Sequence, residues 1–430
     1  MVKDRSLVPS EQAMELFNRY SGTLNIVVIS HLNGEIDEAI LRESLDLLQA
    51  TYPRLNWHIT GSFHNWKFTD EGTKKISLRV VNTDSYNCWQ EVVTEELNQK
   101  TLSNECLLRY VLWQNPQQTC LIATIHHGIA DGLSAVQLQV ELLTYYQKIA
   151  AGKSPTPHHN LPHLPAITDL LPKVMQGYRG IVRSTFFLLK TKLKMLRFKP
   201  ECLKSEIKVP LESRSCTMTQ RFLAAEVTEK LISLSKQNKT TIQGVLCVAI
   251  SIAVANQIRD GKMRNINVSC SSYVDLRRRA EPTITLKAMG IFVSFINTFH
   301  TLTPQKSFWE LAQEVSREIQ LGLSKQDHFK PLRLMRQVAA YYLANPDQLS
   351  LTTSVTNLGK LNIPTEYGDL ELKEISFLPS NVVFGRTLTV AVTTFKGKMI
   401  LNFLVSQPSV SKETMEKLAD QVIQHLSLKH

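Results

Sequence analysis

The chain has 430 residues, of which 43% are hydrophobic and 20% charged, and its formal net charge is +11. Its length suits about two domains, and its composition is that of an ordinary globular protein. The start of the chain does not open a signal peptide, and the longest apolar stretch, 245–255, is too short to span a bilayer. Seven scattered cysteines without metal or disulfide spacing favour reduced thiols, so we expect a cytoplasmic protein.

The first third of the chain is predicted to alternate between strands and helices. Ser10 is a candidate N-cap for a first helix, and a β-prone run over 25–32 ends at the turn Asn33-Gly34. Apolar spacing predicts a second helix that ends near Tyr52-Pro53. Further strands are expected over 57–68, 75–81, 107–113 and 119–125, and a helix over 89–97.

The most informative motif lies between the strand 119–125 and a helix that ends near Gly152. It reads H-H-G-I-A-D-G and contains His126, His127, Asp131 and Gly132. An acyl transfer from a thioester to an alcohol or amine needs a base that takes the proton of the alcohol or amine and can return it to the departing thiolate. A neutral imidazole suits both steps, because its ordinary pKa is about 6.5. Adjacent residues in an extended chain point opposite ways, so only one histidine can face a substrate.

The histidine pair has two other interpretations. A pair on a loop can be merely solvated or hydrogen-bonded, without a chemical role. A metal site is disfavoured because adjacent histidines chelate poorly and no Cys-x-x-Cys or His-Glu-x-x-His motif completes one.

Two segments of unusual composition follow this motif. The stretch 153–171 is predicted to be a surface linker, although His158, His159 and His163 are also potential metal ligands. The stretch 178–200 mixes basic and large apolar side chains and has no acidic residue. It could lie on an anionic membrane, dock an acidic acyl carrier protein, or form a crossover helix whose charges face water. Nucleic acid is not expected, since no reading motif accompanies the basic segment.

The second half of the chain is also predicted to be mixed α/β. An almost wholly apolar helix over 241–258 should be buried, and the strand 265–276 leads into three arginines that begin at Arg277. The other expected elements are a strand near 216, strands over 290–301 and 349–359, a hairpin over 388–405, and helices over 228–237, 307–321 and 412–426.

These motifs resemble the chloramphenicol acetyltransferase-like superfamily, which includes peptide condensation domains, polyketide-associated acyltransferases, wax ester synthases and plant BAHD acyltransferases. The pattern H-H-x-x-x-D-G carries the resemblance, and the N-terminal third and later motifs extend it. Four stretches are similar to superfamily motifs: Leu32-Asn33-Gly34-Glu35-Ile36-Asp37, Tyr52-Pro53-Arg54-Leu55, Val274-Asp275-Leu276-Arg277 and Thr356-Asn357-Leu358-Gly359. The plant motif Asp-Phe-Gly-Trp-Gly is replaced by Val382-Val383-Phe384-Gly385-Arg386, which argues against a plant-type enzyme.

The resemblance implies an α/β fold of two lobes, mixed sheets with flanking helices and an active-site tunnel between the lobes. The expected division is an N-terminal lobe over 1–170, a basic crossover linker over 171–208 and a C-terminal lobe over 209–430. His127 would be the general base and His126 structural, while Asp131 would pair with Arg277 to fix the loop. Gly132 would allow the substrate to approach the backbone closely. Thr356 or Asn357 would donate a hydrogen bond to the oxyanion of the tetrahedral intermediate. A solvated arginine turn and a structural turn at 356–359 are the alternatives.

The implied reaction is direct acyl transfer from a thioester, held by coenzyme A or by an acyl carrier protein in trans, to a hydroxyl of a lipid or secondary-metabolite acceptor. No covalent intermediate is expected because no activated serine or cysteine accompanies the histidine. No metal or redox cofactor is implied, and a monomer is expected. The rivals are a free-standing condensation enzyme that forms an amide and a non-catalytic module that binds a carrier or membrane.

Overall fold

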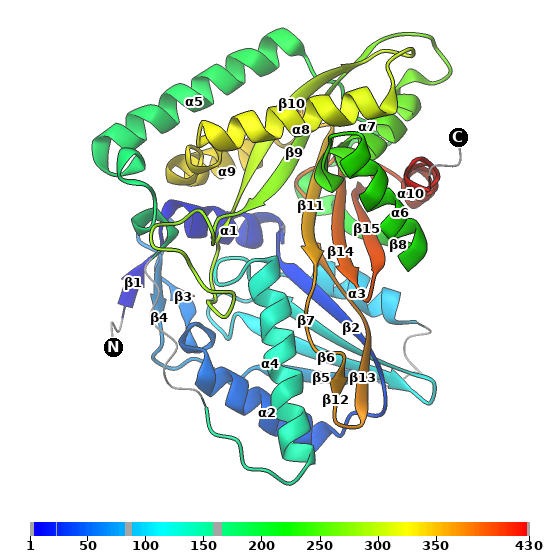
Figure 1. Cartoon of the computed structure of the whole chain (residues 1–430). Helices are drawn as coiled ribbons and strands as arrows, with labels where there is room; N and C mark the ends of the chain where they lie inside the picture. The colour runs from blue at the N-terminus through cyan, green and yellow to red at the C-terminus, as the bar shows by residue number, and fades with distance from the viewer. Residues whose placement is uncertain (1–3, 23, 82–87, 158–165, 428–430) are drawn as a thin grey trace. The chain divides into compact units, whose positions relative to one another are not determined.

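The structure is a computed structural model that describes residues 4–22, 24–81, 88–157 and 166–427 (Figure 1). The chain divides into two compact units. Unit 1 contains the residues up to Leu170 together with Arg277–Phe292 and Asn362–Ser380, and unit 2 contains the rest of the chain. The two later segments join unit 1 although they lie within the predicted C-terminal lobe, because a local pattern does not show which sheet a strand enters.

Unit 1 is built on a six-stranded mixed sheet with the order β12-β13-β2-β7-β6-β5. Its strands are β2 (Ile26–Asn33), β5 (Ser77–Val81), β6 (Leu108–Asn115), β7 (Gln118–Ile125), β12 (Glu366–Tyr367) and β13 (Leu370–Pro379). β5 and β6 run parallel, and the other neighbours are antiparallel. The side chains of β2 and β7 are buried along almost their whole length, so both faces of the sheet are covered.

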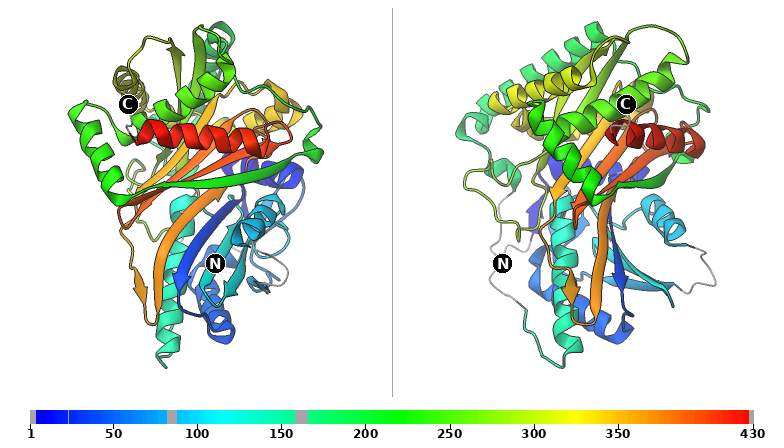
Figure 2. Two further views of the ribbon diagram at one scale, coloured as in Figure 1. Left: turned by 90° about the vertical axis from the view of Figure 1, so that its right-hand side faces the viewer. Right: turned by 45° about the vertical axis from the view of Figure 1, so that its right-hand side comes forward.

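Helices cover both faces of this sheet. α2 (Glu38–Thr51) and α4 (Gly132–Ala150) pack together, and α4 contacts β2, while α3 (Trp89–Asn98) contacts β2 and β7 from the other face (Figure 2). Unit 1 also contains α1 (Pro9–Ser21), a small sheet of β1 (Asp4–Ser6), β4 (Lys67–Thr69) and β3 (His58–Thr60), and the 3₁₀ turns η1 (Pro53–Asn56) and η2 (Ile167–Asp169).

Two predictions for this unit were wrong in detail. The expected strand 57–68 is two short antiparallel strands, β3 and β4, because the chain turns at Gly61, whose φ is +90°. The N-cap of α1 is Val8 and not Ser10, since the Glu11 carboxylate accepts a 3.0 Å hydrogen bond from the Val8 N–H. The potential metal ligands His158, His159 and His163, within the predicted surface linker, lie outside the described residues.

Unit 2 is built on a second six-stranded mixed sheet, with the order β10-β9-β11-β14-β15-β8. Its strands are β8 (Ser215–Leu223), β9 (Ile266–Asp275), β10 (Val293–Leu302), β11 (Thr353–Lys360), β14 (Leu388–Phe395) and β15 (Lys398–Gln407). β11 runs parallel to both β9 and β14, and the other pairs are antiparallel. The predicted mixed sheets with flanking helices are therefore confirmed.

Among the helices of unit 2, α7 (Ile242–Arg259) contacts β9, β11, α8 and α10. The others are α5 (Gly177–Phe198), α6 (Ala225–Gln237), α8 (Phe308–Ser324), α9 (Met335–Ala344) and α10 (Lys412–Leu426), with 3₁₀ turns η3 (Lys173–Met175), η4 (Leu211–Ser213), η5 (Asp327–Phe329), η6 (Leu332–Leu334) and η7 (Pro346–Gln348). The short helix α9 and the strands β12 and β13 had no counterpart among the predicted elements.

Helix α7 corrects the expectation about membrane-spanning length. Its 18 residues make it long and apolar enough to cross a membrane, by length and composition alone, and it is the one such helix among the described residues. However, 67% of it is buried inside the fold, as in the core helix of a globular protein. Its hydrophobicity is accounted for by packing on the sheet and on α8 and α10.

Candidate active site

His127 lies on the loop between β7 and α4, in unit 1, and its ring is half-buried. Its Nδ1 lies 2.8 Å from the carbonyl oxygen of Ala130. Because a carbonyl can only accept, Nδ1 carries the proton and donates, so the neutral ring has its lone pair on Nε2. Among the described residues Nε2 has no hydrogen-bond partner. The ring is therefore oriented with a free basic nitrogen, as a general base requires.

His126 lies beside His127 but is held in the interior. Its Nδ1 accepts a 2.9 Å hydrogen bond from the Gly128 N–H, so its Nε2–H donates to the Glu15 carboxylate at 3.1 Å. A Cβ on Gly128 would lie 2.7 Å from His126 Nδ1, which only glycine avoids. Both nitrogens of His126 are thus used for structure, and the ring ties the loop to α1.

Glu15 is the buried partner that sequence reasoning missed. It lies on α1 and also binds the Ser103 hydroxyl at 3.0 Å and the Arg19 guanidinium. Burial alone would raise the pKa of the Glu15 carboxyl, but the hydrogen bonds from His126 and Arg19 and the Arg19 charge outweigh it, so this pKa is lowered. No local pattern links this helix residue to a histidine more than one hundred positions away.

Asp131 forms a two-pronged ion pair with Arg277. Arg277 Nη1 and Nη2 donate to the two carboxylate oxygens at 2.9 and 2.8 Å. The side chains are almost fully buried, and both residues belong to unit 1. The arginine predicted from the V-D-L-R stretch is therefore brought to the predicted aspartate, and this arginine is not part of a solvated turn.

The remaining lone pairs of Asp131 are used by the backbone. Its carboxylate accepts 2.9 Å hydrogen bonds from the Ser134 N–H at the start of α4 and from the Phe292 N–H. The Asp131 N–H donates to the Gly290 carbonyl at 3.0 Å. Sequence reasoning missed Ser134, Gly290 and Phe292; only Ser134, three residues after a helix-capping aspartate, had a local signal.

The electrostatics of the loop differ between its two ionisable groups. Desolvation by burial lowers the pKa of the His127 imidazole, and the Ala130 carbonyl and the Asp131 charge offset it only in part. For Asp131 burial opposes ionisation, but the charge and hydrogen bonds of Arg277 outweigh it, so the pKa of this carboxyl is lowered. At neutral pH the loop therefore holds a neutral histidine and an ionised aspartate.

The other predicted site residues are Gly132, Thr356 and Asn357. Gly132 is the first residue of α4. Thr356 and Asn357 lie on β11 in unit 2, and the Asn357 side-chain oxygen accepts a 2.8 Å hydrogen bond from the Gly359 N–H at an irregularity of the strand. Within the part of the chain that the structure describes, no three His, Cys, Asp or Glu side chains gather as metal ligands would.

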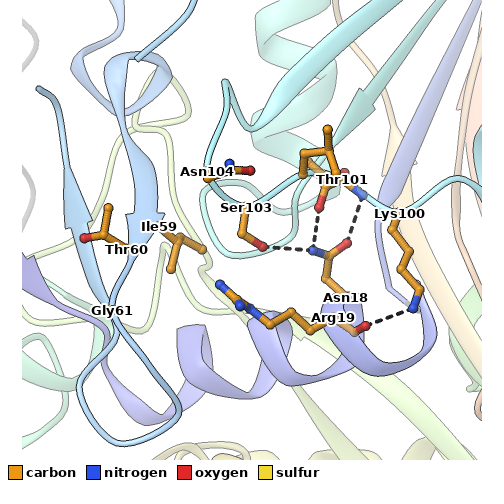
Figure 3. Close-up of a pocket in the computed structure, with 10 residues that line it drawn as sticks. Asn18, Arg19, Ile59, Thr60, Gly61, Lys100, Thr101, Ser103 and Asn104 are labelled. Atoms are coloured by element: carbon orange, nitrogen blue, oxygen red, sulfur yellow. Dashed lines mark hydrogen bonds between the residues drawn. The ribbon is translucent and has the colours of Figure 1, made fainter. Parts of the chain in front are cut away.

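A separate hollow of about 540 Å³ lies in unit 1 (Figure 3). Asn18 and Arg19 of α1 form one side and the loop around Ser103 another, and the Asn18 amide donates to the Thr101 carbonyl at 2.8 Å. Ser103 connects this wall to Glu15 and so to His126. None of the predicted site residues is among the described residues that line the hollow.

Comparisons with known proteins match both parts of the chain. A family described as condensation domain matches residues 12–163, and one described as phthiocerol/phthiodiolone dimycocerosyl transferase C-terminus matches residues 212–404. The chain is therefore similar to condensation domains over its first part and to phthiocerol/phthiodiolone dimycocerosyl transferases over its later part. The predicted resemblance is thereby confirmed. A phthiocerol/phthiodiolone dimycocerosyl transferase from Mycobacterium ulcerans (strain Agy99) is 22% identical over 379 residues, which are 86% of each chain.

Solved structures of acyltransferases and condensation domains share the fold across almost the whole chain. A trichothecene 15-O-acetyltransferase from Fusarium sporotrichioides is similar with a TM-score of 0.77 and 13% identity, over 99% of this chain and 94% of that chain. A starter condensation domain of rhizomide synthetase, solved with C8-CoA, is similar with a TM-score of 0.70 and 15% identity, again over 99% and 94%. At these identities the likeness concerns the fold.

Proposed function

We propose that this protein is an acyltransferase that moves an acyl group from a thioester to a hydroxyl of a lipid or secondary-metabolite acceptor, with His127 as the general base. The observation that carries the proposal is the orientation of His127. Its Nδ1–H is bound to the Ala130 carbonyl, its Nε2 is free among the described residues, and its pKa is lowered. A neutral ring fixed in this tautomer is ready to accept a proton at neutral pH.

In the proposed reaction the Nε2 lone pair takes the proton of the acceptor hydroxyl as its oxygen attacks the thioester carbonyl. The tetrahedral intermediate collapses, the carbon–sulfur bond breaks, and the imidazolium returns the proton to the thiolate. The Ala130 carbonyl accepts from Nδ1–H throughout and stabilises the imidazolium. Asp131 and Arg277 act on the loop: their ion pair fixes the backbone at the start of α4.

Thr356 and Asn357 are proposed as alternative donors to the oxyanion of the intermediate. Neighbouring residues of a strand point to opposite faces, so at most one of the two can serve. The Asn357 side-chain oxygen is engaged by Gly359, but its amide nitrogen has no partner among the described residues. Thr356→Val and Asn357→Ala would separate them, since loss of a real oxyanion donor costs about 10²–10³ in kcat.

The substrate class rests on the relatives. The matched relative from Mycobacterium ulcerans is named as a transferase of dimycocerosyl groups to phthiocerol and phthiodiolone, and a fold neighbour is named as an O-acetyltransferase. Another neighbour was solved with C8-CoA. These names favour an ester-forming reaction with a thioester donor, which is held by coenzyme A or by an acyl carrier protein. A cytoplasmic location is proposed because all seven cysteines are free thiols.

The test is thiol release from a panel of acyl-CoAs of different chain length with alcohol and amine acceptors offered separately. Release that depends on an alcohol, with formation of the ester detected by mass spectrometry, would support the proposal. If no acyl-CoA reacts, the same acyl groups are presented on acyl carrier proteins. A failure of both donors with every acceptor would contradict an acyltransferase and favour a binding module.

A second function has a specific observation in its favour. The match to the condensation-domain family spans residues 12–163 and includes the loop with His127. The same base could deprotonate an amine and form an amide instead of an ester. Turnover with amine acceptors and none with alcohols would establish this second function in place of the first.

A further inference from the structure

Helix α5 (Gly177–Phe198) packs against η3 and η6 within unit 2, and most of its side chains are exposed (Figure 1). The inward face contains the buried Gly180 and Ser184. A Cβ on Gly180 would lie 2.0 Å from the Met175 carbonyl, so the helix sits close against η3. At the end of the helix, the ring centroid of Phe198 lies 5.7 Å from that of Phe299 on β10. These contacts fix which side of α5 faces outward.

The outward face carries a continuous row of large apolar side chains. We call it the α5 stripe; its members recur at gaps of three or four residues, as on one side of a helix, and they are Tyr178, Val182, Phe186, Leu189, Leu193 and Leu196. Their exposed fractions run from 47% to 79%. An exposed apolar row along most of a helix of about 33 Å is unusual for a globular surface and marks an interaction site.

The charges beside the α5 stripe are all of one sign. Arg179, Arg183, Lys190 and Arg197 fall along one border of the stripe at helical spacing and are exposed. No acidic side chain occurs between Asp169 and Glu201. An apolar row with a basic border is the arrangement by which amphipathic helices lie in the interface of an anionic bilayer.

We propose that the α5 stripe and its basic border dock this protein on the surface of an anionic lipid membrane, with α5 lying in the membrane plane. A second copy of the chain is the poorer occupant, because pairing two stripes would bring two basic borders together. An acidic carrier protein would satisfy the charges, but it would not by itself account for an apolar row that runs the length of the helix. The inference does not depend on the proposed acyltransferase activity.

The experiment is co-sedimentation of the full chain with vesicles of phosphatidylcholine alone and of phosphatidylcholine mixed with phosphatidylglycerol. One variant removes the stripe with Phe186→Gln, Leu189→Gln and Leu193→Gln. A second removes the border with Arg183→Gln, Lys190→Gln and Arg197→Gln. The matched control exchanges two exposed apolar residues elsewhere in unit 2, Ile207→Gln and Met263→Gln. Circular dichroism and thermal melting establish that each variant is folded.

The wild type and the control should bind the anionic vesicles, and more weakly at high salt, because screening weakens the attraction of the basic border. The stripe variant should bind at least about tenfold more weakly, and the border variant should lose the preference for anionic lipid. The proposal is overturned if wild type binds neither kind of vesicle, or if the folded stripe variant binds the vesicles as tightly as wild type does. It is also overturned if the stripe mediates dimers or carrier-protein binding without vesicle binding.

Discussion

The Arg277 guanidinium donates two hydrogen bonds, of 2.9 and 2.8 Å, to the Asp131 carboxylate, and these residues are 146 positions apart in the sequence. The same carboxylate caps α4 through the Ser134 N–H and holds the Phe292 N–H. The pair therefore fastens the segment Arg277–Phe292 to the loop that carries His127. Asp131 makes no hydrogen bond to His127 among the described residues, so its influence on catalysis should be through loop geometry.

Replacing Arg277 should destabilise the protein strongly. Arg277→Ala leaves the Asp131 carboxylate buried without its partner, which costs about 3–5 kcal/mol in the free energy of unfolding. Arg277→Lys keeps the charge but loses the two-pronged geometry, so it should cost less. Urea denaturation measures both, and Arg278→Ala, at the exposed neighbouring residue, is the matched control. Equal stability of the Arg277 and Arg278 variants would contradict the role of this pair.

The Glu15 contact with His126 should contribute to stability only when Glu15 is ionised. The folded-state pKa of Glu15 is lowered from its ordinary 4.5, so its contribution is present above about pH 4.5 and is lost as pH falls through the folded-state pKa. Glu15→Gln should be less stable than wild type at pH 7, and this difference should shrink as the solution is acidified. Thermal melting from pH 7 to pH 3 measures it; a constant difference would contradict the prediction.

Gly128→Ala tests the close approach of the loop to His126. The added Cβ would lie 2.7 Å from His126 Nδ1, so the ring must move and the hydrogen bond from the Gly128 N–H must lengthen. We expect a loss of about 1–3 kcal/mol in the free energy of unfolding, together with reduced turnover. An unchanged Gly128→Ala variant would show that the ring is not tightly confined.

Much of this fold could be predicted from local pattern. The helix over 412–426 has the predicted bounds, and the strands near the motif, β6 and β7, lie within one or two residues of the predicted ranges. Alternating and helical spacing report burial directly, which is why these elements were found. The strand β13, which pairs with β2, had no such prediction, because the identity of a strand's partner is a property of the tertiary fold and not of local sequence.

The residues of the candidate site likewise fall into those that the sequence could predict and those that it could not. His127, Asp131 and Arg277 are in short motifs, so they could be named before their contacts were known. Glu15 and Phe292 could not be, because one acts through a buried carboxylate on a distant helix and the other through its backbone N–H. A backbone donor carries no side-chain signature, and a buried glutamate resembles any surface glutamate in a sequence.

The pH dependence of activity should reflect the lowered pKa of His127. A base is active only when it is unprotonated, so kcat/KM should rise from low pH and reach its plateau with an apparent pKa below the ordinary 6.5. Burial is the main cause of the shift. Initial rates between pH 5 and pH 8 with non-titrating substrates provide the measurement. An acid limb centred above 6.5 would contradict this account of the histidine environment.

The most direct test of the central claim is the rate of thiol release by His127→Ala beside wild type, on an acyl donor and acceptor that wild type uses. The control is His64→Ala, an exposed histidine of the same unit. The account predicts that His127→Ala loses turnover by a factor of about 10² or more while it stays folded and His64→Ala keeps full activity. Turnover that survives in His127→Ala would contradict the general-base role.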